Sequence, residues 1–246
     1  MANTTFSTLK TTALSLFGNN LNANDSLKLE LVGSCINQAL SIIQGEIKGH
    51  PFTLDINNTV SSTTTTPYKT DLADTNIIEI LQVSQRSDPR KMTWIPYTQY
   101  MEYMADPTRL SGTPSWYWTA IQNLNGSGQN IWSLFFIPTP ASAITIYYDY
   151  VKNLQFSANG TSANAEYSPL PTTFDAWIYA EAKPIFYEII MPEANAVIQR
   201  ASAQALEARQ RFKSMILSPA DGYQQVQSRR QYSPYYYSQV GQVSAP

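Results

Sequence analysis

The sequence predicts an α+β protein in which a small helical bundle, formed by the two ends of the chain, carries an antiparallel β-rich insertion. Three observations lead to this prediction. Apolar residues recur at helical spacing in residues 1–51 and again in 170–218, and β-branched and aromatic residues dominate residues 52–169. Residues 219–246 contain no Leu, Ile, Phe, Met or Trp, so we expect them to form an extended arm without a core of its own.

Residues 1–51 have the pattern of a helical hairpin. The first helix has an apolar stripe at spacings of three and four, made by Phe6, Leu9, Ala13, Leu16 and Phe17. Gly18 and two asparagines then supply a stop, and Asn24 or Asp25 can cap a second helix. The stripe of that helix is expected to contain Leu27, Leu31, Cys35 or Ile36, Leu40, Ile43 and Ile47.

Residues 52–169 change to a texture rich in Thr, Val, Ile and aromatic residues, which favours strands. Thr59–Thr66 is a run of β-branched and hydroxyl residues that indicates a β region. The expected strands are Ile77–Val83, Met92–Tyr97, Thr113–Ile121, Ile131–Ile137 and Ala143–Val151, with a short helix at Thr98–Ala105. The connectors are short and contain turn residues, such as Asn125–Gly128 and Pro138–Ser142. We therefore predict that neighbouring strands pair as an antiparallel meander.

Helical spacing returns at Pro171. Thr172 can cap this helix with Asp175 at the third position, and its stripe contains Phe174, Ile178, Ala182, Ile185 or Phe186, and Ile189. Pro184 lies inside the pattern and predicts a kink or an early end. A final helix is expected from Pro192, with Val197, Ala201, Ala205 or Ala208, Phe212 and Met215 facing inward. Its charged residues are expected mostly on the opposite side: Glu193, Arg200, Glu207, Arg209, Arg211 and Lys213.

The composition argues against an enzyme and against a metal or cofactor site. The chain has one histidine, His50, and one cysteine, Cys35, which together exclude a multi-histidine or cysteine-rich metal centre. No nucleophile elbow, phosphate-binding loop or dinucleotide fingerprint occurs. A carboxylate pair could still be formed in space, but the sequence singles out none. Cys35 lies in a helical apolar run and is expected to be a buried small hydrophobe.

Charge and hydropathy limit the partners and the location that we expect. Charged residues make up 14% of the chain and the net charge is -2, so there is no general attraction to nucleic acid. The longest apolar stretches, such as Leu134–Ile137, are far too short to span a bilayer, and the N-terminus lacks the pattern of a secretory signal. We therefore expect no membrane partner and a protein that stays in the compartment where it is made.

Several motifs follow one another in a fixed order along the second half of the chain. They are Gly112–Trp118, the strand that ends in Pro138-Thr139-Pro140, the pair Tyr147-Tyr148, and Leu170-Pro171 with its helix. This series resembles the head-to-tail adaptor proteins of tailed bacteriophages, also called head-completion or tail accessory factors. The N-terminal third is similar to that family in pattern alone, and the β insertion is longer than a minimal adaptor needs.

The resemblance implies a structural virion protein rather than an enzyme. Family members assemble into a ring, usually a dodecamer, that binds the portal protein, receives tail or nozzle proteins and continues the DNA channel. Packaged DNA passes through without specific binding, and no cofactor is implied. The expected location is the head-tail junction of the virion, after synthesis in the host cytoplasm.

The C-terminal segment is the expected partner-binding element. Tyrosine offers a large contact area, a polar tip and little rotamer entropy to lose, which suits a chain that becomes ordered on a partner. The candidate binding residues are Arg229, Arg230, Tyr232, Tyr235, Tyr236 and Tyr237. The alternative for residues 219–246 is a flexible terminus.

A second function stays open, that of a carbohydrate-binding module or tail-fibre component. In a pleated strand Trp116 and Trp118 share one face while Tyr117 points to the other, so two indoles could stack on sugar rings. The same alternation is also the ordinary way to build a sheet core, and we favour this structural interpretation of the two indoles.

Overall fold

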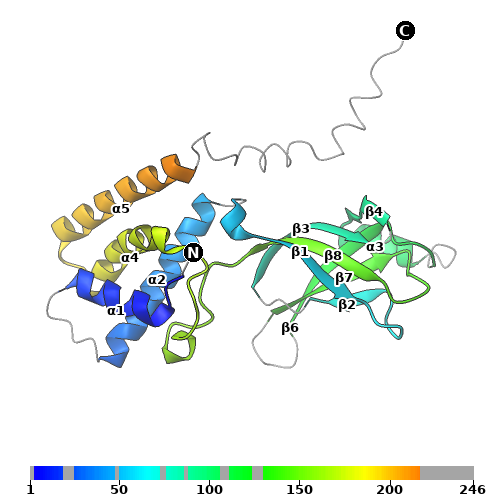
Figure 1. Ribbon diagram of the computed structural model, residues 1–246, viewed down its shortest axis with the longest axis horizontal. Coiled ribbons are helices and arrows are strands. Elements are labelled where there is room, and N and C mark those ends of the chain that lie inside the picture. Colours follow the sequence, from blue (N-terminus) through cyan, green and yellow to red (C-terminus); the bar gives the residue numbers. More distant parts are fainter. Residues whose placement is uncertain are drawn as a thin grey trace, which may run out of the picture. The chain divides into compact units, whose positions relative to one another are not determined.

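The computed structural model describes residues 3–18, 25–47, 50–72, 76–85, 88–105, 111–123 and 130–216. The chain divides into two compact units (Figure 1). The helical unit consists of Met1–Thr53 and Leu154–Pro246, and the β unit consists of Leu54–Asn153. Helices and strands of both units confirm the α+β class. The predicted insertion, residues 52–169, extended too far at its C-terminal end, because the chain from Leu154 onward belongs to the helical unit.

Among its described residues, the helical unit has four α-helices. They are α1 (Phe6–Phe17), α2 (Ser26–Glu46), α4 (Asp175–Ile190) and α5 (Asn195–Ile216). The Thr5 hydroxyl accepts a hydrogen bond from the Thr8 amide at 3.3 Å and caps α1. Asp25, one of the two predicted caps, accepts from the Lys28 amide at 3.3 Å and caps α2. In both cases a side-chain oxygen satisfies an amide that has no partner within the helix.

The buried faces of α1 and α2 differ from the prediction at two leucines. Leu14, not Leu16, is buried in α1, together with the other predicted members of its stripe. Leu27 is exposed because it lies in the first turn of α2, before the part of that helix that packs; the buried run begins at Val32. Cys35 is fully buried among apolar residues, as predicted.

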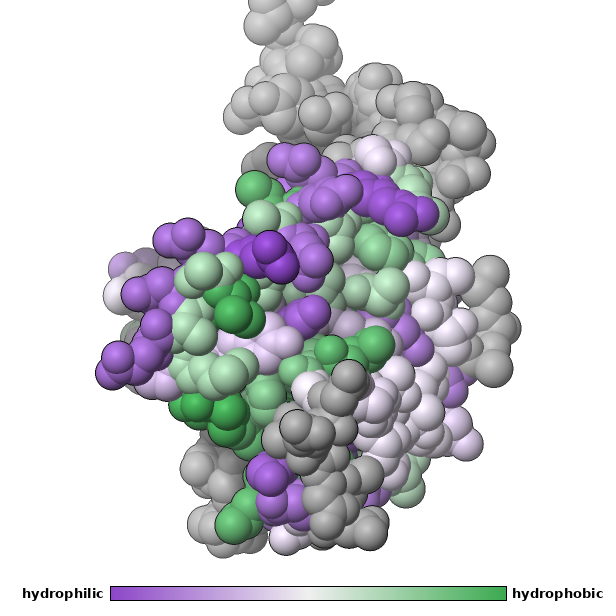
Figure 2. Space-filling view, turned by 90° about the vertical axis from the view of Figure 1, so that its left-hand side faces the viewer, coloured by the Kyte–Doolittle hydropathy of each residue, from purple (hydrophilic) through white to green (hydrophobic). Residues whose placement is uncertain are grey.

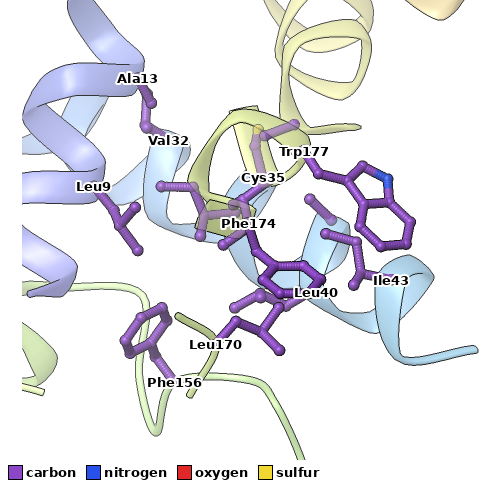
Figure 3. Close-up of a cluster of buried hydrophobic side chains, with 14 of the residues drawn as sticks. Leu9, Ala13, Val32, Cys35, Leu40, Ile43, Phe156, Leu170, Phe174 and Trp177 are labelled. Atoms are coloured by element: carbon purple, nitrogen blue, oxygen red, sulfur yellow. The ribbon is translucent and has the colours of Figure 1, made fainter. Parts of the chain in front are cut away.

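The segment that links the β unit to α4 completes the core of the helical unit (Figure 3). Phe156 stacks on Phe6 with ring centroids 3.9 Å apart, and Leu170 is fully buried. Two amide side chains of α2 hold the segment. Asn37 accepts a hydrogen bond from the Phe156 amide at 2.8 Å, and Gln44 accepts from the Leu154 amide at 3.2 Å. These contacts explain why the boundary lies at Leu154 and not after residue 169.

Helix α4 begins later than the sequence predicted, and of the two outcomes predicted at Pro184, a kink or an early end, the early end does not occur. A 3₁₀ turn, Thr172–Phe174, precedes it, and Thr172 does not cap it. The helix continues past Pro184 to Ile190, so the predicted early end is wrong. Ile189 was expected in the buried stripe but is exposed at the end of the helix.

Helix α5 lies on α4 through small side chains. It begins at Asn195 rather than Pro192, because the Ala194 amide first closes a turn by donating to the Met191 carbonyl. Ala201 and Ala205 are buried as expected, whereas Val197 and Met215 are exposed. Alanines allow close approach but bury little apolar area, and the larger apolar contact of α5 comes from Phe212, which stacks on Trp177 of α4 with ring centroids 5.5 Å apart.

The β unit contains two four-stranded sheets. One has the order β1-β8-β3-β4, built from Leu54–Ser61, Thr145–Lys152, Ile77–Gln85 and Asp88–Lys91. The other has the order β2-β7-β6-β5, built from Lys69–Asp71, Asn130–Ile137, Trp116–Asn123 and Thr93–Trp94. Helix α3 (Tyr97–Met104) follows β5. Side chains of both sheets form one buried cluster that includes Val83, Leu134, Phe136, Ile146 and Tyr148.

The predicted meander is wrong in its strand pairing. Strands β6 and β7 do form an antiparallel hairpin, with Trp116 opposite Ile137. Strand β8, however, pairs with β1 and β3 in the other sheet, and β5 pairs with β6 in parallel. Pro138 and Pro140 follow β7, and residues without an amide hydrogen cannot continue a ladder, so the chain leaves one sheet there and enters the other.

Candidate interaction surfaces

In the helical unit Cys35 is fully buried and His50 is partly buried. Burial raises the pKa of the Cys35 thiol to about 11, which keeps it protonated at neutral pH. Burial lowers the pKa of His50, whose Nδ1 accepts the Phe52 amide hydrogen at 3.4 Å. Within the part of the chain that the structure describes, no three His, Cys, Asp or Glu residues gather as a metal site would require.

The partner-binding residues predicted from the sequence lie outside the described residues. This applies to Arg229, Arg230, Tyr232, Tyr235, Tyr236 and Tyr237, all of which follow the last described residue, Ile216. Their assignment stays a prediction. The surfaces below were not predicted, and each consists of side chains that the structure describes.

The β unit exposes an aromatic and methionine-rich surface around α3, which we call the α3 surface. It consists of Trp94, Tyr97, Met101 and Met104. Trp94 and Tyr97 are each 53% exposed. The three residues of α3 are four and three positions apart, so they share one face of the helix. Large apolar side chains that gather on one exposed face are typical of interaction sites.

Residues of strand β6 hold the rings of the α3 surface in place. The Trp94 indole donates to the Thr119 hydroxyl at 3.3 Å, and the Tyr97 ring lies 5.0 Å from the ring of Trp118. Trp118 also contacts Tyr100 and Phe135, at 5.2 and 5.0 Å between centroids. Because these rings are fixed before any partner arrives, little rotamer entropy is lost on binding.

The aromatic residues of β6 have the alternation that the sequence predicted. Trp116 and Trp118 are partly buried beneath α3, where Trp116 stacks on Tyr103 at 5.2 Å. Tyr117 points to the opposite face, into the core between the sheets, and burial raises its pKa to about 12. The two indoles therefore support α3, and the rings that are open to a partner are those of Trp94 and Tyr97.

The helical unit has a second exposed apolar surface at the connection between α4 and α5. This α4–α5 surface consists of Ile189, Ile190, Met191 and Val197. Figure 2 views the molecule from that side and shows hydrophobic residues gathered between hydrophilic ones. The Tyr187 hydroxyl donates to the Phe17 carbonyl at 2.8 Å and fixes the end of α4 against α1. The surface thus belongs to a well-anchored part of the unit.

A partly buried network of charges, centred on the buried Glu181, holds α5 against the neighbouring helices. The Arg209 guanidinium donates two hydrogen bonds to Glu181, each 2.9 Å long, and a third to Glu46 at 3.4 Å. Trp177 also donates to Glu181, at 2.9 Å, and Lys213 pairs with Glu46. The bond to Glu181 raises the pKa of Arg209, and the bond from Lys213 lowers the pKa of Glu46. Arg209 therefore faces inward, contrary to the prediction.

A spacing in the sequence could have revealed this network. Arg209 follows the buried residues Ala201 and Ala205 at intervals of four, so it continues their stripe. Glu181 likewise follows Trp177 by four residues on α4. A charged residue in a buried stripe predicts a partner of opposite charge, because an unpaired charge would be costly there.

No protein-family model matches the sequence, and no curated protein matches it either. Among the helices of the described residues, none combines the length and apolar character that crossing a membrane requires.

Proposed function

We propose that this chain is a structural subunit of a head-to-tail adaptor ring of a tailed bacteriophage. The observation that carries the proposal is that each unit exposes an apolar surface of its own, the α3 surface on the β unit and the α4–α5 surface on the helical unit. A subunit that joins two different assemblies needs two separate docking surfaces, and closure into a ring needs lateral contacts in addition. The ordered motifs of residues 112–171 support the same class.

The insertion of the β unit into the helical unit supports separate functions for the two units. The β unit begins at Leu54 and ends at Asn153, and Leu54 pairs with Val151 across strands β1 and β8. Its two ends are therefore neighbours, so the unit is a module inserted at one point of the helical unit. In our proposal the helical unit forms the ring and meets the portal, and the β unit receives tail or nozzle proteins.

The proposal assigns no catalytic step to the chain and no sequence-specific grip on DNA. A channel through which DNA passes should not bind it tightly, and a net charge of -2 suits that role. The tyrosine-rich segment 219–246 would bind the portal or a neighbouring subunit through Arg229, Arg230 and its tyrosines. Truncation after Ser218 should then leave a folded protein that fails to join the ring.

Negative-stain imaging of the purified protein, with and without its candidate portal, tests the proposal. We expect the native chain and the double variant Trp94→Ser/Tyr97→Ser both to form rings on the portal. The double variant, however, should fail to recruit tail components. Ile190→Asp should impair ring formation. Ile56→Ser is the matched control, because Ile56 is exposed on β1 and belongs to neither surface. The absence of rings under all conditions would refute the adaptor role.

The exposed rings of Trp94 and Tyr97 favour carbohydrate binding as a second candidate function. A flat indole that is fixed by a hydrogen bond and open on one face can stack on a sugar ring. Titration with soluble oligosaccharides, followed by tryptophan fluorescence, separates the two candidates. Saturable quenching that Trp94→Ser abolishes would favour the sugar-binding function over the adaptor.

A further inference from the structure

The helical unit has an open pocket at the end of α5, which we call the α5-end pocket. Its apolar lining consists of Phe52, Phe174, Phe212, Met215 and Ile216. His50 and Thr173 add polar groups to it. The pocket thus combines apolar walls with a few hydrogen-bonding groups, which is the usual make-up of a site that accepts an amphipathic ring.

Three phenylalanine rings give the pocket its shape. Phe52 meets Phe174 edge to face, with centroids 5.1 Å apart and planes at 78°. Phe174 in turn stacks on Phe212 at 5.8 Å. Met215 is 55% exposed although it lines the pocket. A further ring placed there would bury that methionine and extend the aromatic stack.

The position of the pocket indicates which group fills it. Ile216 is both a lining residue and the last residue of α5, so the following chain starts at the edge of the pocket. The sequence continues Leu217-Ser218-Pro219-Ala220-Asp221-Gly222-Tyr223. Ser-Pro and Asp-Gly are turn-forming pairs that favour a reversal of the chain. Tyr223 is the first aromatic residue after the helix, and a chain of this length spans at most about 23 Å.

We propose that the ring of Tyr223 docks in the α5-end pocket of its own chain. A short tether gives an effective concentration in the millimolar range, whereas a ring from a second molecule would first lose translational and rotational freedom. The phenol hydroxyl suits the polar side of the pocket, and the ring suits its phenylalanine walls. Docking fixes the point from which residues 224–246 continue. The inference does not depend on the proposed function and is tested without a portal.

Methyl NMR of the full-length protein, labelled at its methionine methyl groups, tests the proposal. The Met215 signal is assigned with Met215→Leu, and a docked ring shifts it through its ring current. Tyr223→Ser should move that signal to the position found after truncation at Ser218. The matched control, Tyr235→Ser/Tyr236→Ser/Tyr237→Ser, should leave it unchanged.

Three outcomes would overturn the proposal. The first is a Met215 signal that Tyr223→Ser does not move. The second is a shift caused by the triple variant, which would assign the pocket to a tyrosine further along the chain. The third is a shift that disappears on dilution, because that would mean that a second copy supplies the ring.

Discussion

Replacing Arg209 with methionine should destabilise the helical unit by about 3 kcal/mol. The side chain of Glu181 is 3% exposed and would lose both of its 2.9 Å bonds to the guanidinium. Removing one partner of a buried ion pair costs about 3–5 kcal/mol, because a charge is left without compensation. The 2.9 Å bond from the Trp177 indole remains, which places the expected cost at the lower end of that range.

Urea unfolding followed by far-ultraviolet circular dichroism measures this loss, since the helical unit supplies most of the helical signal. Arg211→Met is the matched control, because Arg211 is exposed on the same helix and its replacement should change stability by less than about 0.5 kcal/mol. The double variant Glu181→Gln/Arg209→Met removes the buried charge but keeps an acceptor for the indole, so it should regain most of the loss. The reasoning fails if Arg209→Met is as mild as its control, or if the double variant is no more stable than the single one.

Three further predictions concern packing, pH and the boundary between the units. Gly33→Ala places a Cβ atom in collision with the Asn159 carbonyl oxygen and should destabilise the protein by at least about 1–3 kcal/mol. The Cβ atom of Gly45→Ala meets nothing within 4 Å, so this variant should stabilise the protein by about 0.5–1 kcal/mol. The midpoints of urea unfolding measure both changes in stability. Because burial lowers the pKa of His50, the unfolded chain binds that proton first, so stability should fall as the pH drops through the pKa of the unfolded histidine, about 6.5. His50→Gln should flatten the slope of stability against pH. Replacing residues 54–153 with a short linker should preserve the helical circular dichroism signal, and replacing residues 52–169 should abolish it by removing part of the helical core. If both deletions give the same signal, the domain boundary at Leu154 is contradicted.

Local patterns in the sequence predicted the features that depend on neighbouring residues. The helical runs at both ends, the Asp25 cap and the burial of Cys35 all follow from periodicity and capping within one helix. The alternation of Trp116, Tyr117 and Trp118 also follows from the geometry of a single strand. Such features need no knowledge of what lies across the core.

Features that depend on distant residues were missed. Strands β7 and β8 are both rich in apolar and aromatic residues, and nothing in the sequence of β8 tells which sheet it joins, because pairing is decided by partners far along the chain. The segment that begins at Leu154 has no helical or strand periodicity, so its role in the core of the helical unit could not be predicted from the sequence. Arg209 resembled a solvent-exposed charge because the buried carboxylate that it meets lies on another helix.

The insertion of the β unit also determines the order in which the protein can fold during synthesis. The β unit is continuous in sequence, whereas the core of the helical unit joins Phe6 to Phe156, and so it cannot close until both have left the ribosome. While the strands are being synthesised, helices α1 and α2 lack the contacts with the segment from Leu154 onward that complete their core. Once folded, the β unit holds its ends together, and replacing a loop of about 100 residues by one of about 5 lowers the closure entropy cost by roughly 3 kcal/mol. The folded β unit therefore lowers the entropy cost of bringing together the two chain segments that form the helical unit.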